Sequence, residues 1–307
     1  MFLPKPFNSI LELIKQFPDD KCCVSHLEKI MWRGNVVSPF DKNSSVYKCA
    51  NGKYKCRNTN KYFTVLTGSI FEATKIPLQK WFMAIYFITA HKKGISSHQL
   101  ARDIEVTQKT AWFMLHRIRF ALQHKSFQKQ MEGIVEADET YVGGKEGNKH
   151  KSKRTGDTHG RSTKVKAPVF GLVQRGGDVF AKVVADTKSS TLQPIIGERV
   201  KKGARLMTDE WQAYNGLHSR YNHQIVNHGA KQYAEGDVYT NTLEGFWSWI
   251  KRAIMGIYHK TSKKHLQRYV DEVVFRYNTR KQTSYNRFNM FLEQMQGFKI
   301  TYSQLIG

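Results

Sequence analysis

The stretch IVEADETYV, residues 134–142, decides the fold of this chain. Its β-branched and aromatic residues predict a strand, and Gly143 and Gly144 end it. Successive side chains of a strand point to opposite faces of a sheet, so only one of Asp138 and Glu139 can face a functional site. The strand therefore supplies the first candidate acid of an α/β core.

Two further carboxylates follow in other elements. Residues 203–209 predict a short buried strand with Asp209 at its carboxyl end, where open α/β sheets bind ligands. Residues 241–252 predict an amphipathic helix that carries Glu244, and 34 residues lie between the two acids. Singly, each acid is typical of a turn, a cap or a solvated helix. The order strand, strand, helix indicates a metal site for phosphoryl transfer, in which carboxylates hold a pair of Mg²⁺ ions.

Length and charge narrow the class of protein. The chain has 307 residues, 40% of them hydrophobic, which is enough for two or more domains with their own cores. A formal net charge of +24 favours a polyanionic partner over a merely soluble cationic surface. Residues 143–166 carry 8 Lys/Arg against 2 Asp/Glu, and residues 251–281 carry 9 against 2. An acidic pocket flanked by basic arms suits an enzyme that acts on nucleic acid.

The basic segments supply candidate DNA contacts. The Gly- and Lys-rich segment 143–166 is expected to form a loop or wide hairpin that closes over DNA beside the site. Lys251 lies about two helical turns after Glu244, so this cation and this carboxylate share a helix face. The other candidate phosphate-binding residues are Lys149, Lys151, Lys153, Arg154, Arg252, Lys263, Lys264 and Arg268.

Residues 96–119 predict a helix-turn-helix, with helices over 96–103 and 107–119 and a tight turn over 104–106. Its predicted small core is Leu100, Ala101, Ile104, Val106, Ala111 and Leu115. The residues expected to reach bases or phosphates in the major groove are Thr107, Gln108, Lys109 and Thr110. An ordinary αα-hairpin is the alternative, because no glycine marks the turn. The apolar segment 81–90 is too short to span a bilayer and predicts a buried helix.

The segments between the acids predict the rest of a sheet. Residues 167–174 and 179–185 predict a β-hairpin, residues 189–200 a helix capped by Ser or Thr near 187–190, and residues 224–227 a last short strand. Three antiparallel strands followed by strands alternating with helices are the order of an RNase H-like sheet. His228 follows the last strand, where it either orients water at the scissile phosphate or is a surface loop residue.

Over most of its length the chain resembles insertion-sequence transposases of the DDE class, in the ISXO-like group of bacterial elements. The resemblance is carried by GSIFEATKIPLQKWF (68–82), DETYVGGK (138–145), Thr208-Asp209 and NTLEGFW (241–247). It implies an RNase H-like core in which Asp138 and Asp209 are the first two metal ligands. In this group the last acid is sometimes an Asn, which corresponds to Asn241. Glu244 is favoured here, because a carboxylate binds Mg²⁺ better than a neutral amide does.

The resemblance implies cleavage at terminal inverted repeats and strand transfer into target DNA, with two Mg²⁺ or Mn²⁺ ions held by Asp138, Asp209 and Glu244. The expected partners are double-stranded DNA, at the element ends and the target, and at least one further copy of the chain. A domesticated or inactive sequence-specific DNA-binding regulator and an RNase H-like nuclease are the alternatives. A regulator that only binds DNA has no use for three converging carboxylates in a basic protein, so these acids favour an enzyme.

The N-terminal part departs from this group, whose members carry a zinc ribbon with two Cys-x-x-Cys pairs. Here Ser38-Pro39-Phe40-Asp41 and Cys56-Arg57-Asn58-Thr59 stand at the expected places, and adjacent Cys22 and Cys23 lack chelating spacing. We expect a ribbon-like β fold over 36–66 without structural zinc. The scattered cysteines and the lack of a signal peptide or membrane segment predict a reducing bacterial cytoplasm, at the nucleoid.

The sequence thus predicts an α/β protein with an RNase H-like mixed sheet preceded by a small β module and a helix-turn-helix. Four parts are expected. They are an N-terminal helix and ribbon-like module (1–75), a helix-turn-helix region (76–130), a catalytic domain (131–285) and a C-terminal tail (286–307).

Overall fold

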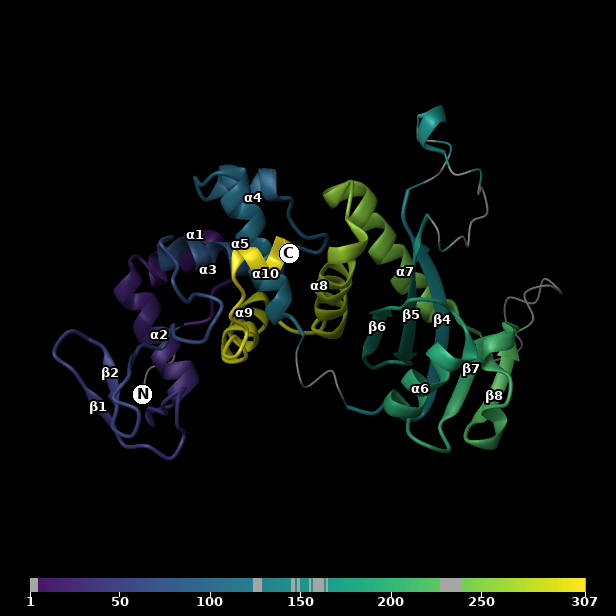
Figure 1. Cartoon of the computed structure of the whole chain (residues 1–307), viewed down its shortest axis with the longest axis horizontal. Coiled ribbons are helices and arrows are strands. Elements are labelled where there is room, and N and C mark those ends of the chain that lie inside the picture. The colour runs from purple at the N-terminus through teal and green to yellow at the C-terminus, as the bar shows by residue number, and fades with distance from the viewer. Residues whose placement is uncertain are drawn as a thin grey trace. The chain divides into compact units, whose positions relative to one another are not determined.

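The chain forms two compact units, residues 1–122 together with 281–307, and residues 123–280 (Figure 1). The computed structural model describes residues 5–123, 129–144, 147, 150–154, 156, 163, 165–226 and 239–306. Residues 281–307 were expected to form the end of the catalytic domain and a tail. They instead group with the N-terminal unit, because helix α9 (Ser284–Glu293) packs against α2 (Asp20–Trp32) and α3 (Leu78–Ala90).

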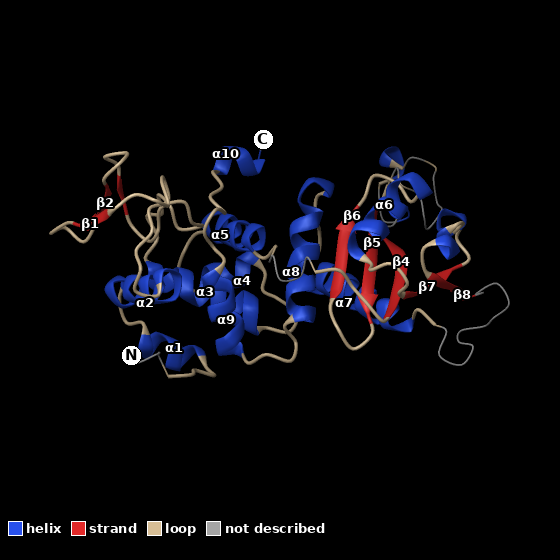
Figure 2. Cartoon of the chain, turned by 90° about the horizontal axis from the view of Figure 1, so that it is seen from below, coloured by secondary structure: helices blue, strands red, loops and turns tan. Residues whose placement is uncertain are grey.

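A five-stranded mixed sheet forms the centre of the second unit, in the order β6-β5-β4-β7-β8 (Figure 2). Its strands are β4 (Ile134–Val142), β5 (Ala167–Gln174), β6 (Val179–Val183), β7 (Arg205–Asp209) and β8 (Asn222–Val226). β4, β5 and β6 pair antiparallel, whereas β7 lies parallel to β4 and β8 parallel to β7. This is the strand order of an RNase H-like sheet, so the predicted fold class is confirmed.

Helices cover both faces of this sheet (Figure 1). Helix α6 (Ser189–Arg199) and the 3₁₀ turns η4 (Gln212–Tyr214) and η5 (Leu217–Ser219) pack on one face, over Val135 and Leu206. Helices α7 (Asn241–Ala253) and α8 (Leu266–Asn278) pack on the other, over Val169 and Val173. The remaining described elements of this unit are η3 (Lys151–Lys153), a π-helical turn (Ile254–Tyr258) and η8 (Lys263–His265).

Helix α6 begins where the sequence predicts, but the prediction that a Ser or Thr side chain caps it is wrong. Its N-cap is Lys188, which makes no side-chain cap hydrogen bond. Asp186 organises the turn instead, because its Oδ1 accepts hydrogen bonds from the Lys188 N–H (3.1 Å) and the Thr191 hydroxyl (2.6 Å). A carboxylate just outside the helix therefore ties the residue before the helix to its first turn.

The N-terminal unit is mainly helical. Its helices are α1 (Ile10–Gln16), α2 (Asp20–Trp32), α3 (Leu78–Ala90), α4 (Ser97–Asp103), α5 (Gln108–Ala121), α9 and α10 (Tyr302–Ile306). Helix α3 is largely buried, as predicted, and the rings of Phe17, Phe82 and Phe288 join it to α9, since Phe82 meets both other rings edge to face. No helix in the described ranges is long and apolar enough to cross a membrane.

The two helices predicted over 96–119 are present as α4 and α5. Ser96 and Thr107 cap them, each accepting a hydrogen bond from a backbone N–H of its own helix. The turn needs no glycine, because Glu105 adopts the left-handed conformation itself, with φ of +52°. Of the predicted small core, Leu100, Ile104, Ala111 and Leu115 are buried, whereas Ala101 and Val106 are half-buried.

The predicted ribbon-like β fold over 36–66 is confirmed. Three short strands, β1 (Val46–Lys48), β2 (Tyr54–Cys56) and β3 (Tyr62–Phe63), form an antiparallel sheet in that order. One face buries Tyr54, Cys56 and Phe63 against Trp32. An apolar cluster therefore holds this small sheet.

Candidate active site

The structure decides which acid of β4 faces the candidate site. Side chains alternate along the strand, so Glu136 and Asp138 lie on the face covered by α7, and Glu139 lies on the opposite face. There the Glu139 carboxylate accepts a hydrogen bond from the Tyr214 hydroxyl (2.7 Å). Asp138 is therefore the acid of this pair that meets the helix carrying the third candidate.

A tryptophan of α7 reaches Asp138 across the sheet. Trp247 Nε1 donates a hydrogen bond to Asp138 Oδ2 (2.8 Å). The register pairs Asp138 with Gly171 of β5, and a Cβ at position 171 would lie 2.4 Å from an indole carbon of Trp247. Because real Cβ atoms do not approach so closely, the missing side chain at 171 lets the indole lie on the sheet beside Asp138.

The second candidate acid lies level with the first. Glu136 of β4 pairs with Met207 of the parallel strand β7, and two further residues along this register bring Asp209 opposite Asp138. Adjacent strands are about 4.8 Å apart, so both carboxylates leave the same face near the carboxyl end of β7. Asp209 Oδ1 accepts a hydrogen bond from the Trp211 N–H (3.0 Å), which fixes the turn after the strand.

The charges of Asp209 and Glu244 act on Asp138. The pKa of Asp138 is raised from its ordinary value of 3.8 to about 6, chiefly by burial and also by the negative charges of Asp209 and Glu244. Hydrogen bonds from Trp247 and from the Glu139 backbone lower it. Among the described residues, no three His, Cys, Asp or Glu side chains lie close enough together to hold a metal ion as they stand. The three carboxylates are thus electrostatic neighbours whose mutual repulsion a divalent cation would relieve.

One consequence concerns stability without metal. The stability that protonated Asp138 contributes is present below pH 3.8 and is lost as the pH rises through about 6, because its pKa is raised on folding. In metal-free protein, Asp138→Asn is therefore expected to raise the melting temperature. The corresponding gain in the free energy of unfolding should grow from about pH 4.5 to about pH 7.5 and reach at most about 3 kcal/mol. Melting curves in EDTA measure it, and a loss of stability at the higher pH contradicts it.

Helix α7 carries both candidates for the third position. Glu244 lies about one turn before Trp247, whose indole donates a hydrogen bond to Asp138. The charge of Glu244 also acts on Asp138. Asn241 is the exposed first residue of the helix, about one turn farther from Trp247 than Glu244 is. Lys251 lies one turn after Trp247 and is exposed. This placement favours Glu244 over Asn241.

A buried acid that the sequence motifs do not single out anchors the start of α7. Glu136 is fully buried, and its Oε1 accepts hydrogen bonds from Arg175 Nε (2.7 Å) and the Thr242 hydroxyl (2.8 Å). Its Oε2 accepts one from the Leu243 N–H (3.0 Å). The α7 N-cap makes no side-chain cap hydrogen bond of its own, so a strand residue supplies the cap.

Arg175 extends this anchor to the chain that enters α7. One guanidinium nitrogen donates to the Tyr239 carbonyl (2.8 Å), and the guanidinium lies 3.6 Å from the centroid of the Tyr239 ring. The Glu136–Arg175 pair therefore fixes the helix start that bears Glu244. The only sequence signal was an acid inside an apolar strand, two residues before Asp138, on the same face.

The predicted phosphate-binding residues are mostly exposed. Lys263 donates to the Thr163 carbonyl (3.1 Å), Arg154 to the Gly147 carbonyl (2.8 Å) and Arg252 to the Ser248 carbonyl (3.1 Å). Arg268 is half-buried. The other exposed residues of this set are Lys151, Lys153, Lys251 and Lys264. Lys149 and His228 lie outside the described residues.

The predicted base-contacting residues gather at the start of α5. The Thr107 hydroxyl accepts from the Thr110 N–H (3.2 Å) and so works as a cap, and Thr110 is half-buried. Gln108 donates to the Ser97 hydroxyl (2.8 Å), and Lys109 Nζ lies 5.2 Å from the centroid of the Tyr302 ring. Gln108 and Lys109 are the exposed members that lie beyond the cap.

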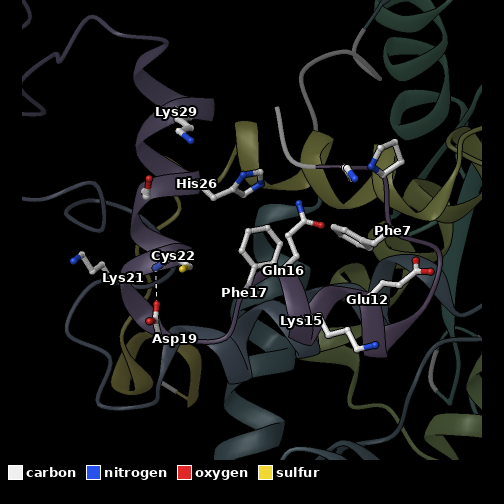
Figure 3. Close-up of a pocket in the computed structure, with 13 residues that line it drawn as sticks. Phe7, Glu12, Lys15, Gln16, Phe17, Asp19, Lys21, Cys22, His26 and Lys29 are labelled. Carbon is white, nitrogen blue, oxygen red and sulfur yellow. Dashed lines mark hydrogen bonds between the residues drawn. The ribbon is translucent and has the colours of Figure 1, made fainter. Parts of the chain in front are cut away.

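A wide hollow also lies in the N-terminal unit, lined by residues 5–7 and by α1 and α2, with a volume of ≈ 1060 Å³ (Figure 3). Phe17 and His26 lie near its centre, and Lys15, Lys21 and Lys29 lie toward its edge. Burial lowers the pKa of His26 to about 4. None of the candidate acids lines this hollow.

Comparisons with known proteins place the chain in a family. Residues 130–278 match the ISXO2-like transposase domain. A protein of the transposable element ISH50 from Halobacterium salinarum is 31% identical over 252 residues, which cover 78% of this chain and 84% of that protein. A transposase-like protein of Haemophilus influenzae is 34% identical over 101 residues, covering 33% of this chain and 80% of that protein.

A weaker likeness exists to a solved structure, a pre-cleavage Mos1 transpososome. It covers 68% of this chain and 76% of that chain, with 11% identity and a TM-score of 0.25. The family is shown by the matched domain and by the relative from ISH50, which aligns with most of both chains. The chain therefore belongs to the ISXO2-like family of insertion-sequence transposases.

Proposed function

We propose that this transposase cuts DNA at the ends of its element and joins them to target DNA, with Asp138, Asp209 and Glu244 holding two divalent ions, Mg²⁺ or Mn²⁺. The observation that carries the proposal is the level placement of Asp138 and Asp209 on parallel strands, with the charge of Glu244 acting on Asp138. Three carboxylates are the hard oxygen donors that these ions prefer. The donor set therefore fits the ions.

The protein's own residues prepare the reaction by orientation. The Trp247 N–H holds the Asp138 carboxylate, the Trp211 N–H holds that of Asp209, and the Glu136 anchor holds the helix that bears Glu244. Bound ions would supply activation of the attacking oxygen and stabilisation of the leaving oxygen. Attack by water cuts a strand and attack by a DNA 3′-hydroxyl joins one, so the same acids serve both in-line displacements.

The basic residues and the helix pair complete the proposal. The exposed cations of the second unit, with Lys251 on the α7 face of Glu244, hold backbone phosphates, which positions DNA without reading its sequence. Helices α4 and α5 recognise the terminal repeats through Gln108 and Lys109. Two copies of the chain hold the two ends. This substrate places the protein at the nucleoid of the cytoplasm.

Removal of divalent metal is expected to abolish cleavage. Wild-type protein is incubated with labelled duplex DNA that carries the sequences flanking its own gene, first in EDTA and then with Mg²⁺ or Mn²⁺ added in excess. Nicking and strand joining are expected only with added metal, because the ions supply the charge stabilisation at phosphorus. Cleavage in EDTA contradicts the proposal. Nicking without joining indicates a nuclease, and metal-independent binding without cleavage indicates a regulator.

A further inference from the structure

The outward face of the N-terminal ribbon carries a row of aromatic and basic side chains. The register pairs Tyr47 with Lys55 and Lys55 with Tyr62, so these three side chains cross the three strands on one face. Tyr47 is 50% exposed and Tyr62 57% exposed, and Lys55 Nζ lies 5.6 Å from the centroid of the Tyr62 ring. The opposite face packs against Trp32. Core packing therefore explains the inner face of the ribbon but not the outer one.

The ribbon is also strongly basic. Residues 36–66 carry 6 Lys/Arg and a single acid, Asp41. The Asp41 carboxylate is bound by the ribbon itself, because it accepts hydrogen bonds from the Asn58 side chain (2.7 Å) and the Asn43 N–H (2.9 Å). Lys61 adds a second pairing of cation and ring, because its Nζ lies 5.3 Å from the centroid of Phe40, which is partly exposed. Such a surface is complementary to a polyanion.

We propose that the ribbon face, formed by Tyr47, Lys55 and Tyr62, binds duplex DNA as a contact surface additional to α4 and α5. Strands lie about 4.8 Å apart, so three of them span roughly 10 Å, which fits a major groove about 12 Å wide. Figures 1 and 2 show the ribbon projecting from the helices of its unit, where a duplex can reach it.

In this docking Lys55, on the central strand, points into the groove, and the hydroxyls of Tyr47 and Tyr62 reach phosphates on either side. The proposal rests on the proposed function only in taking DNA as the partner. It requires neither the three acids nor metal, so binding and cleavage test the two proposals separately.

The test measures binding of full-length protein to a short duplex in EDTA, where cleavage is blocked, over a series of salt concentrations. Lys55→Ala is expected to reduce the slope of log affinity against log salt by about 1. The double variant Tyr47→Phe, Tyr62→Phe is expected to weaken binding about tenfold, because two solvent-exposed hydrogen bonds of modest net strength are lost. Lys15→Ala, an exposed lysine on α1, serves as the control and is expected to change neither quantity.

A photo-crosslinking side chain tests direct contact. Placed at position 47 or 62 it is expected to cross-link duplex DNA, and placed at Leu11, which is 67% exposed on α1, it is not. Melting temperatures of all variants are expected to match the wild type, because the inner face with Tyr54 and Phe63 is untouched.

Unchanged affinity and salt slope, at an unchanged melting temperature, overturn the proposal whether or not the wild-type protein cuts DNA. A changed oligomeric state at constant DNA affinity overturns it in favour of a protein contact.

Discussion

Replacing Asp209 by asparagine is expected to reduce nicking and joining of element ends by about 10³-fold or more, with binding of the same DNA retained. Loss of one charged ligand weakens the stabilisation of developing charge at phosphorus, which is worth several kcal/mol, and each 1.36 kcal/mol is about tenfold in rate. The asparagine carbonyl can still accept the Trp211 N–H that Asp209 Oδ1 accepts now (3.0 Å). The fold around the site should therefore persist.

The matched control for this change is the neighbouring acid. Glu210 directly follows Asp209 and is exposed, so Glu210→Gln makes the same change of charge outside the candidate site. Its rates are expected to equal those of the wild type. Rates with labelled duplex and Mg²⁺ measure both variants, and binding to the same duplex is followed in parallel. Comparable cleavage by Asp209→Asn and wild type excludes Asp209 from the metal site.

Replacing Glu136 by alanine is expected to lower the free energy of unfolding by about 3 kcal/mol, because a buried carboxylate that is removed leaves its partners without compensation. Arg175 loses its ion pair, and the N–H of Leu243 and the hydroxyl of Thr242 lose their acceptors. The start of α7 is then no longer held to β4. We therefore also expect weaker binding of Mn²⁺, because Glu244 follows the anchored turn directly.

A buried acid in α8 separates this positioning role from stability alone. Glu272 is also fully buried and pairs with Arg276, so Glu272→Ala should cost a similar free energy without changing Mn²⁺ affinity. Urea unfolding measures the free energy of unfolding. The electron paramagnetic resonance signal of free Mn²⁺ measures how much Mn²⁺ the protein binds in the absence of DNA. In a Glu244→Gln background, Glu136→Ala should cause no further loss of Mn²⁺ affinity. An additive loss refutes action through Glu244, and equal Mn²⁺ affinities of Glu136→Ala and wild type refute the positioning role.

Local pattern was enough to predict most elements. The strand over 134–142 was predicted from β-branched residues ended by two glycines, and the β5–β6 hairpin from two apolar runs joined by a turn. The helices now seen as α4, α5 and α7 followed from capping residues and apolar spacing. These features depend on residues close in the chain. The predicted first and last residues of the elements were less accurate. Strand β6 ends at Val183 rather than at 185, and strand β8 begins at Asn222 rather than at 224.

The sequence by itself thus determined the order of strands and helices along the chain, the two helices before the core and the three candidate acids, because each depends on the pattern within one segment. Only the tertiary structure decided that Asp138 rather than Glu139 faces α7, that Glu136 caps that helix, and that Gly171 makes room for Trp247. The reason is distance along the chain. Trp247 and Asp138 are 109 residues apart, and no local pattern of either segment contains the other. Packing of the sheet against α7 brings them together, and burial then gives the Asp138 carboxylate its raised pKa.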